Sequence, residues 1–406
     1  MPSGPELDDQ SSESNPHYPF LLFEGNIGIP QSILYKAYIV ASQQLPRLTL
    51  NLALDASSMS DHDDLVSATA ILLIANPAHN TALNRRKKLI QTCPSKLALD
   101  EDIKFVAALF GSKQASKSSL LWHHRRWLFR HKYNTSVTHT GPKDSDPDSL
   151  EYTSIPVKDL SSEFELVARA CEIYPRNYHA WLHRYLCAQC LVSQVKENVP
   201  GALEVLFQEL EASHRWIELH VSDYTAAQYL LRLDIIIQSI GVHAPRPLSP
   251  HLDAFHSTAS ISTSYNPITL SALSLVGSYP THESLWLYLR LAWNALEHQN
   301  DIANRWIIDL VLTLNRNNHP EGDWPDPLIQ QIYSSCRTED LPFIRKYASR
   351  FLAWTMVLVG MQYPLVCFSL LTLTYDQQQD GLPYDAIPRI LTDPELPAIY
   401  LAGLCS

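Results

Sequence analysis

The fold is decided by the stretch Asn177-Tyr178-His179-Ala180-Trp181-Leu182-His183-Arg184, because weaker copies of it lie before and after it. One copy runs from Ser118 to Arg125, and others centre near Leu83, Ala227 and Trp286. A supersecondary unit repeated in this way is typical of a solenoid. In a helix, Trp at i and Arg at i+3 share a face, so the ring packs between helices while the guanidinium reaches a carbonyl or carboxylate. The copies predict an all-α fold, an α–α superhelix built as a solenoid of antiparallel helical hairpins.

Composition supports this reading and places the chain in the cytoplasm. The 406 residues are 46% hydrophobic and include only 12 Gly, which argues against a sheet-rich or glycine-loop nucleotide fold. The seven Cys residues form no dense pattern, which indicates reduced thiols. The N-terminal residues are polar and acidic, so we expect no secretory leader.

Charge disfavours general nucleic-acid binding, since the chain carries a formal net charge of −11. The charge is uneven, however, because Lys and Arg far outnumber Asp and Glu between Asn84 and Lys132. We therefore expect a local basic face in this stretch.

Three regions follow along the chain. Residues 1–60 lack clear periodicity apart from a helix expected over Gln31 to Gln44, and we expect this segment to be partly disordered. Residues 61–300 hold the repeats, and residues 301–406 form a C-terminal helical capping region.

Loop insertions and helix starts can be placed within the repeats. Two long intervals between copies contain segments rich in Pro, Ser, Thr and Asp near 133–154 and 241–266, which are typical of surface loops. The pairs Asn76-Pro77 and Asn266-Pro267 each resemble an N-cap followed by proline at the first helical position.

One segment is long and apolar enough to be weighed as a membrane span. Phe351 to Tyr375 contains no charged residue, but Gly360 and Pro364 divide it. Two buried helices of a terminal hairpin fit this pattern better than a span, so we expect no membrane span.

Laid side by side, the copies resemble the α-subunit family of protein prenyltransferases, whose unit is a helical hairpin with a Tyr-x-x-Trp-x-x-Arg core. The strong match is the segment from Tyr174 to Arg184, and the resemblance covers about Asp61 to Leu296. The copies are eroded, since Leu83 replaces the first Trp and Ala227 replaces the fourth. Such erosion is similar to the divergent branch called prenyltransferase α-subunit repeat-containing proteins.

This resemblance implies a subunit of a geranylgeranyltransferase that is inactive alone. The partner would be a prenyltransferase β subunit of the Rab geranylgeranyltransferase type, which holds the zinc ion and the isoprenoid tunnel. The substrates would be an isoprenoid diphosphate and an acceptor protein with a C-terminal Cys, such as a SNARE protein. No cofactor is expected in this chain.

The residues themselves offer no metal set with convincing spacing. Cys187-x-x-Cys190 lies on the helix of Trp181 and reads as buried structural thiols. His123 and His124 are adjacent, so they point to different faces of a helix, which is poor geometry for a shared metal.

By resemblance, residues before the Trp of the second and third copies face the partner's active site. We therefore assign Lys117, Tyr178 and His179 to the leaving diphosphate, because an ammonium, a phenol and an imidazole can stabilise or donate to its oxygens. Asn177 and Arg176 are candidates for substrate binding.

Each assignment has a structural alternative. Lys117 reads equally as a solvated lysine, Tyr178 as a core aromatic and Asn177 as a helix cap. Buried aromatics at helical spacing are usually core. A structural role is expected for the remaining repeat positions, namely Trp122, Arg125, Trp181, Arg184 and Trp286.

Two rival functions stay open. The eroded repeats could form a non-enzymatic helical scaffold that binds another protein through its concave face. The basic stretch could bind RNA or anionic lipid, although the net charge of the whole chain opposes this.

Overall fold

The structure is a computed structural model that describes residues 18–23, 26–53, 59–93, 97–133, 148–241, 267–293 and 338–358. Contacts divide the chain into two units, Met1–Pro247 and Leu248–Ser406. The boundary falls inside the expected 241–266 loop insertion, whereas the sequence placed the end of the repeats near residue 300. Residues 134–147 of the other expected insertion lie outside the described part of the chain.

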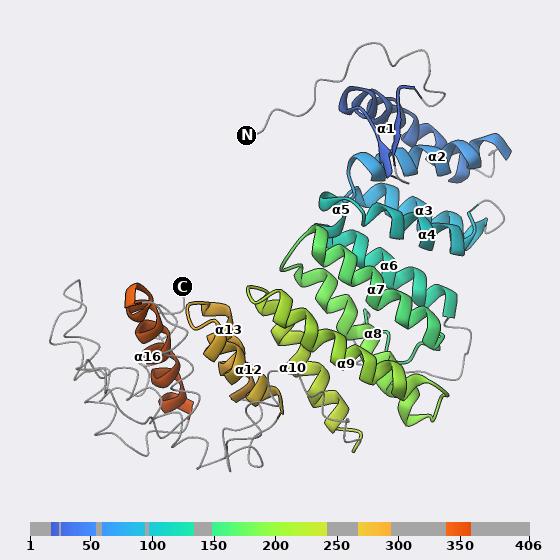
Figure 1. The fold of residues 1–406 in the computed structure, drawn as a ribbon. Helices are drawn as coiled ribbons and strands as arrows, with labels where there is room; N and C mark the ends of the chain where they lie inside the picture. The colour runs from blue at the N-terminus through green and yellow to red at the C-terminus, as the bar shows by residue number, and fades with distance from the viewer. Residues whose placement is uncertain are drawn as a thin grey trace, which may run out of the picture. The chain divides into compact units, whose positions relative to one another are not determined.

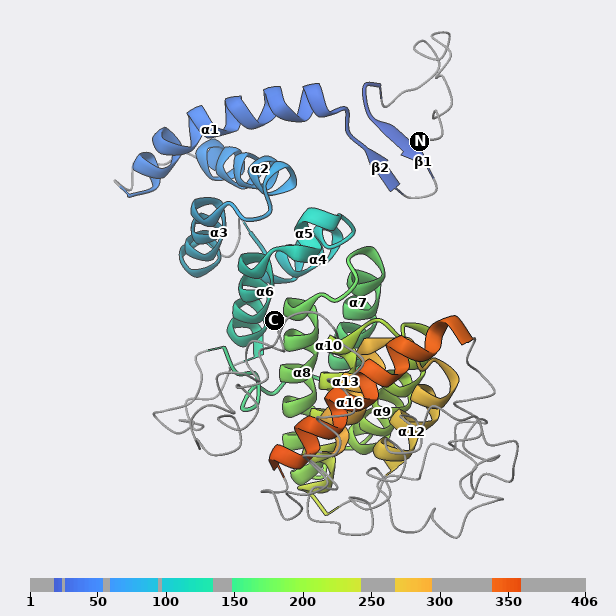
Figure 2. The same cartoon turned by 90° about the vertical axis from the view of Figure 1, so that its left-hand side faces the viewer.

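The first unit begins with a helix that the sequence only partly predicted. A short antiparallel hairpin of β1 (Leu21–Phe23) and β2 (Asn26–Gly28) precedes α1 (Gln31–Ala53), which packs on α2 (Met59–Ala75) (Figure 2). The helical stack therefore starts within the segment 1–60 that we had separated from the repeats. The expected helix over Gln31 to Gln44 is present but continues past an internal proline, Pro46. A buried stripe of Ala41, Leu45 and Leu48 explains the continuation, because its contact with α2 offsets the lost backbone hydrogen bond. Residues 1–17 lie outside the described part.

Successive helical hairpins follow α1 along the first unit (Figure 1). The second helices, α3, α6, α8 and α10, contact one another in chain order and form one layer. This arrangement confirms the predicted all-α hairpin solenoid; in the described part of this unit the only strands are β1 and β2. The bounds of the remaining helices are α3 (Asn80–Thr92), α4 (Leu99–Leu109), the short α5 (Lys113–Lys117), α6 (Ser119–Tyr133), α7 (Val157–Ile173), α8 (Tyr178–Lys196), α9 (Ala202–Leu219) and α10 (Tyr224–Gln238).

The second helix of each hairpin starts at a polar side chain four residues before the Trp position. Asn177 accepts a hydrogen bond from the Ala180 amide, and His79 accepts one from the Ala82 amide. Ser118 and Asp223 occupy the same place before α6 and α10 and accept from backbone amides there. Such caps satisfy amides that the first helical turn leaves unpaired, and they set the register of each hairpin.

One helix start differs from the expectation. The pair Asn76-Pro77 does not open α3; Asn76 instead accepts from the Ala78 amide in the preceding turn, and the cap is His79. The cap stands at His79 because it must lie four residues before Leu83, which occupies the buried position of the motif Trp. The second pair behaves as expected in part, since α12 begins at Pro267, while Asn266 lies outside the described residues.

The described part of the second unit contains a further hairpin and one long helix. The hairpin is α12 (Pro267–Ser278) with α13 (Glu283–Ala292), and α16 (Leu341–Leu358) follows a turn of 3-10 helix at Thr338–Asp340. Trp286 is buried in α13 with its ring centroid 6.3 Å from that of Phe351 in α16. Arg290, which is one residue late in the fifth copy, lies over the ring of Trp354 at 4.5 Å. Helix α16 therefore packs on the last described hairpin.

The apolar segment from Phe351 to Tyr375 is described only as far as Leu358. Among the described helices, none has both the length and the apolar character needed to cross a bilayer. The remainder of the expected terminal hairpin lies outside the described residues.

Candidate functional site

The motif arginines tie each hairpin to the next. Arg184 on α8 donates from Nε and Nη2 to the two carboxylate oxygens of Glu209 on α9, at 2.6 and 2.7 Å. Its Nη1 donates to the carbonyl of Phe164 on α7 at 3.0 Å. The guanidinium thus bonds within its own hairpin and to the following one, reaching both a carbonyl and a carboxylate as the motif predicts.

The two preceding hairpins repeat this arrangement. Arg125 pairs with Glu163 on α7, and Arg86 pairs with Asp102 on α4 at 2.7 Å. Their Nη1 atoms donate to the carbonyls of Ile103 and Val66, at 3.1 and 3.2 Å. The same contact in three hairpins stabilises one stacking geometry, since a bidentate guanidinium accepts few orientations.

Each of these carboxylates also receives a second donor, from the second helix of its own hairpin. This donor is the residue just before the Arg position of that hairpin. His183 Nε2 lies 2.8 Å from Glu163, His124 Nε2 lies 3.1 Å from Asp102, and Tyr229 donates to Glu209 at 2.6 Å. These bonds form what we call the carboxylate ladder. The list of its members is Asp102, Glu163 and Glu209 with Arg86, Arg125, Arg184, His124, His183 and Tyr229.

The ladder is buried, and its electrostatics are those of a structural network. Burial alone would raise the pKa of Glu163, but the charge of Arg125 and the hydrogen bonds from Arg125 and His183 lower it to about 2. Burial lowers the pKa of His183, so the ring stays neutral and donates from Nε2 to the carboxylate. These groups are therefore not available to a ligand.

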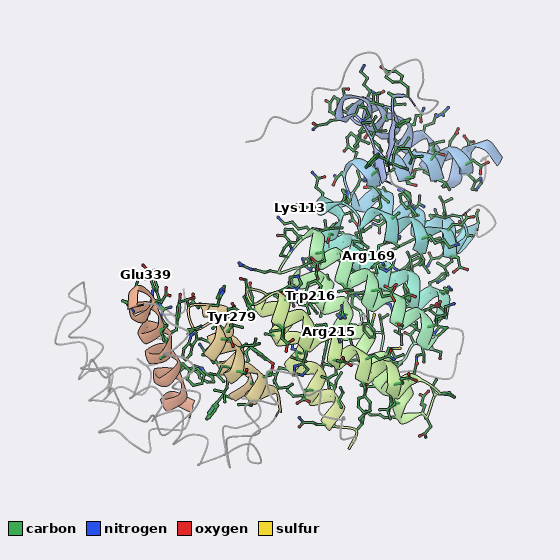
Figure 3. The ribbon with its side chains drawn as sticks, in the orientation of Figure 1. Lys113, Arg169, Arg215, Trp216, Tyr279 and Glu339 are labelled. Atoms are coloured by element: carbon green, nitrogen blue, oxygen red, sulfur yellow. The ribbon has the colours of Figure 1, made fainter. Side chains whose placement is uncertain are left out.

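The motif tryptophans are buried between hairpins. Trp122 is fully buried and donates from Nε1 to the Ser116 carbonyl at 2.8 Å. The Trp181 ring centroid lies 5.2 Å from that of Tyr229 and 5.7 Å from that of Trp216 on α9, which is labelled in Figure 3. Their surroundings are those of core side chains.

The candidate site residues lie where the hairpins turn. We call this edge the hairpin-tip rim and define it by the α5–α6 junction at Lys117–Ser118, the α7–α8 loop at 174–177 and the first two residues of α8, Tyr178 and His179. Asn177 joins the two, because its Nδ2 donates to the Ser116 carbonyl at 2.6 Å while its Oδ1 caps α8. Asn177 is 1% exposed and its amide is fully engaged, so its geometry is that of a cap rather than of a group presented to a substrate.

Two pairs at this rim remain accessible. Lys117 is exposed, and its Nζ lies 5.8 Å from the ring centroid of Tyr174. Tyr178 is 57% exposed, which excludes a core role, and its ring centroid lies 5.6 Å from that of His179. The structure thus places Lys117 against the α7–α8 loop and places Tyr178 with His179 on the next helix turn.

His179 and Arg176 complete the rim. His179 is half-buried, and burial together with the charge of Arg126 lowers its pKa, so it is a neutral donor or acceptor near pH 7. Arg176 is exposed and holds a left-handed backbone with φ of 58°, which turns the chain into α8. Both side chains remain candidates for ligand contact.

No metal site is found in the described part of the chain, where three or more ligating side chains nowhere gather. Cys187 and Cys190 are buried, and Cys190 donates to the Thr153 carbonyl at 3.0 Å. Burial raises the pKa of both thiols, which disfavours the thiolate that a metal needs. His123 and His124 point apart, toward Asp148 and Asp102 respectively.

Sequence reasoning missed several partners. Tyr174 lies inside the quoted motif yet was given no role, although its position three residues before the cap hinted at the rim. The ladder carboxylates were also missed, and a single acidic residue on the apolar face of each first helix was the available signal. The expected basic face is reduced, because Arg86, Arg125 and Arg126 are buried in ion pairs.

Comparison with known proteins agrees with this architecture. Residues 160–191, which cover most of the α7–α8 hairpin, match the family described as protein prenyltransferase alpha subunit repeat. Protein prenyltransferase alpha subunit repeat-containing protein 1 of Danio rerio is 30% identical over 250 residues, covering 57% of this chain and 54% of that protein. The protein of the same name from Homo sapiens is 26% identical over 333 residues, covering 73% of this chain and 79% of that protein.

A more distant relative carries an enzyme subunit's name. Geranylgeranyl transferase type-2 subunit alpha of Candida albicans is 25% identical over 265 residues, covering 60% of this chain and 66% of that protein. For the Danio rerio relative, the match spans only about half of that protein's length. The matched hairpin, the relatives and the all-α hairpin solenoid agree that the chain carries a protein prenyltransferase α-subunit repeat at residues 160–191 and is similar to the repeat-containing proteins of that name.

Proposed function

We propose that this chain is the α-type subunit of a heterodimeric protein prenyltransferase and that its hairpin-tip rim completes the diphosphate site of a β-type partner. The observation that carries the proposal is the exposure of Lys117 and of Tyr178 with His179 at the hairpin that best preserves the family motif. The ladder, in contrast, is buried, so its side chains do not face solvent.

Exposed apolar side chains near the same rim support a protein partner. Ile173 and Leu219 end the first helices of two successive hairpins and are 37% and 73% exposed. Tyr224, at the start of α10, is 47% exposed. Large apolar side chains gathered at one edge are typical of a surface that a partner covers.

The chemistry needs positive charge and hydrogen-bond donors at the leaving group. In prenyl transfer the carbon–oxygen bond to diphosphate breaks while the thiolate sulfur of the acceptor Cys forms a bond to the same carbon. Lys117 would offset the charge that gathers on the departing diphosphate, and the Tyr178 hydroxyl and neutral His179 would donate to its oxygens. All three act without covalent chemistry of their own.

The proposed partner and substrates rest on the family resemblance and are supported by the name of the Candida albicans relative. A β subunit of the Rab geranylgeranyltransferase type would supply the zinc ion and the isoprenoid tunnel, since the buried thiols of this chain do not fit a metal. The acceptor would be a protein with a C-terminal Cys, such as a SNARE protein, and the lipid would be geranylgeranyl diphosphate. We place the reaction in the cytoplasm, where the free cysteines of the described chain would stay reduced.

A second candidate function is a non-enzymatic scaffold for another protein. It is favoured by the fourth copy, in which Ala227 and Leu230 replace the motif Trp and Arg and are both buried. Replacing motif residues by other buried apolar side chains would keep the helical solenoid, whether or not the protein still takes part in catalysis.

Co-expression separates the two. The tagged full-length chain is purified with a type-2 geranylgeranyltransferase β subunit, and the complex is assayed for zinc and for transfer of geranylgeranyl to a cysteine-terminated acceptor. The proposal expects a stoichiometric complex with activity that neither subunit has alone. A stable complex without transfer would favour the scaffold, and no complex would contradict the proposed partner.

A further inference from the structure

A cluster of cations lies on the layer of second helices, apart from the ladder. It contains Lys87 on α3 with His123, Arg126 and Arg130 on α6, and we call it the Asp148 cluster after the carboxylate that these side chains surround. Arg126 donates to Asp148 from Nη2 at 2.7 Å, and His123 Nδ1 lies 2.8 Å from the same carboxylate. Arg130 Nη2 approaches Asp148 at 3.5 Å.

Three cationic side chains of this cluster lie around one described carboxylate. Arg126 and Arg130 pair with Asp148, and the charges of Asp148 and Arg130 both act on Lys87. Burial and the charge of Arg130 lower the pKa of Lys87, although Asp148 raises it. The Lys87 ammonium lies 5.5 Å from the ring centroid of Trp127.

Arg126 provides an independent sign of a missing anion. Its side chain is 7% exposed, yet Nη1 is buried without a hydrogen-bond partner among the described residues. A buried guanidinium nitrogen left unpaired is costly, and native structures seldom leave one so. The charge of Arg126 also lowers the pKa of His179, so Arg126 lies within electrostatic reach of α8.

Asp148 shows which chemistry the cluster accepts. Its carboxylate is bound by the Nε and Nη2 atoms of Arg126 and by the imidazole of His123, both on α6. A second carboxylate offered from outside would meet Lys87 first, and it would pair with the buried Nη1 atom of Arg126 once the side chains around that atom move aside. The few cations are partly enclosed, which suits individual side-chain carboxylates better than the extended phosphate backbone of RNA or a flat lipid surface.

We propose that the Asp148 cluster is a docking site for an acidic segment of a partner protein, with Lys87 and Arg126 as its recognition residues. The acidic segment would bridge α3 and α6, the second helices of successive hairpins. This proposal does not depend on prenyl transfer, and it holds equally for a scaffold.

The test uses fluorescence anisotropy with the full-length chain and a short fluorescein-labelled peptide of alternating glutamate and glycine. The same peptide with glutamine in place of glutamate is the probe control. Lys87→Glu reverses the charge in the cluster, and Lys104→Glu makes the same change at an exposed position on α4 as the matched control. Unchanged melting temperatures establish that both variants fold.

We expect the glutamate peptide to bind and the glutamine peptide not to bind. Lys87→Glu should weaken binding by about ten-fold or more, while Lys104→Glu should stay within about two-fold of wild type. Should Lys87→Glu melt early, Lys87→Gln replaces it, with an expected loss of several-fold.

Three results would overturn the proposal. One is equal binding of the two peptides, and another is an equal loss in the Lys87 and Lys104 variants, which would indicate only general surface charge. The third is tighter binding of polyuridylate or of phosphatidylserine vesicles than of the acidic peptide, which would assign the cluster to nucleic acid or membrane.

Discussion

Glu163 illustrates how a single residue of this protein is used. Its carboxylate receives Arg125 from the preceding hairpin and His183 from its own hairpin, and it is buried. A buried charge is tolerated only when its partners are in place, so the residue specifies how two hairpins stack rather than adding a reactive group.

Removing that charge should destabilise the first unit. Glu163→Gln leaves the guanidinium of Arg125 buried without its counter-charge, and we expect a loss of about 3–5 kcal/mol in the free energy of unfolding. Urea unfolding followed by circular dichroism measures it. Glu165→Gln on the same helix is the control, because Glu165 is exposed. Equal stability of the two variants would mean that the ladder contributes nothing.

The same residue predicts a dependence of stability on pH. The pKa of Glu163 falls from 4.5 to about 2 on folding, so the unfolded chain binds the proton first as pH is lowered. Its contribution is complete above pH 4.5 and is lost as pH falls toward 2. Wild type should therefore lose more stability than Glu163→Gln over this window, as measured by urea midpoints at successive pH values. Parallel pH profiles would contradict a depressed pKa.

At the rim, the proposed chemistry predicts slower transfer without loss of assembly. In the reconstituted heterodimer, Lys117→Ala and Tyr178→Phe should each slow single-turnover prenyl transfer about ten- to a hundred-fold, as expected for loss of one charge-assisted contact of about 1.5–3 kcal/mol. Lys113→Ala, at the other end of α5, is the matched control. Wild-type rates in both variants, with assembly confirmed, would shift preference to the scaffold.

At the scale of elements, the hairpins are joined by tryptophans as well as by the ladder. Trp181 is 4% exposed and contacts Tyr229 on α10 and Trp216 on α9, while its Nε1 donates to Asp223 at 3.3 Å. One side chain on α8 therefore fixes both helices of the next hairpin, including the cap of α10.

Trp181→Ala should leave a cavity between these hairpins. We expect a loss of about 3–5 kcal/mol in the free energy of unfolding, measured by urea denaturation. Trp127→Ala is a matched control with a smaller expected cost, because Trp127 is only half-buried on the neighbouring helix α6. A Trp181→Ala protein that melts within a degree or two of wild type would show that the repeat register is wrong.

At the scale of the whole molecule, the exposed apolar residues of the rim predict dependence on a partner. If the β-type subunit covers Ile173, Tyr178, Leu219 and Tyr224, binding to the folded state should raise the melting temperature of this chain, and the rise should follow the logarithm of the partner concentration above the dissociation constant. Differential scanning fluorimetry with increasing β subunit measures the shift. A monodisperse monomer whose melting temperature ignores every prenyltransferase β subunit would contradict the assignment.

The hairpin repeat could be predicted because its signals are local. Helix geometry sets the spacing of the cap, of the aromatic residue four positions after it and of the Arg three residues later. These spacings can be read directly from the sequence. The rim residues Lys117, Tyr178 and His179 were found through a resemblance whose motif is also local. Helix α1 was underestimated because Pro46 signals a break locally, while contact with α2 overrides it.

The sequence by itself therefore determined the helical hairpins, their register and the buried places of Trp122, Trp181 and Trp286. Only the tertiary structure decided which carboxylate each Arg meets, that Asn177 is used up as a cap, and that Arg126 is left with an unpaired nitrogen. The physical reason is separation along the chain. Arg125 and Glu163 are 38 positions apart, and no local propensity specifies a contact of that span before the hairpins have packed.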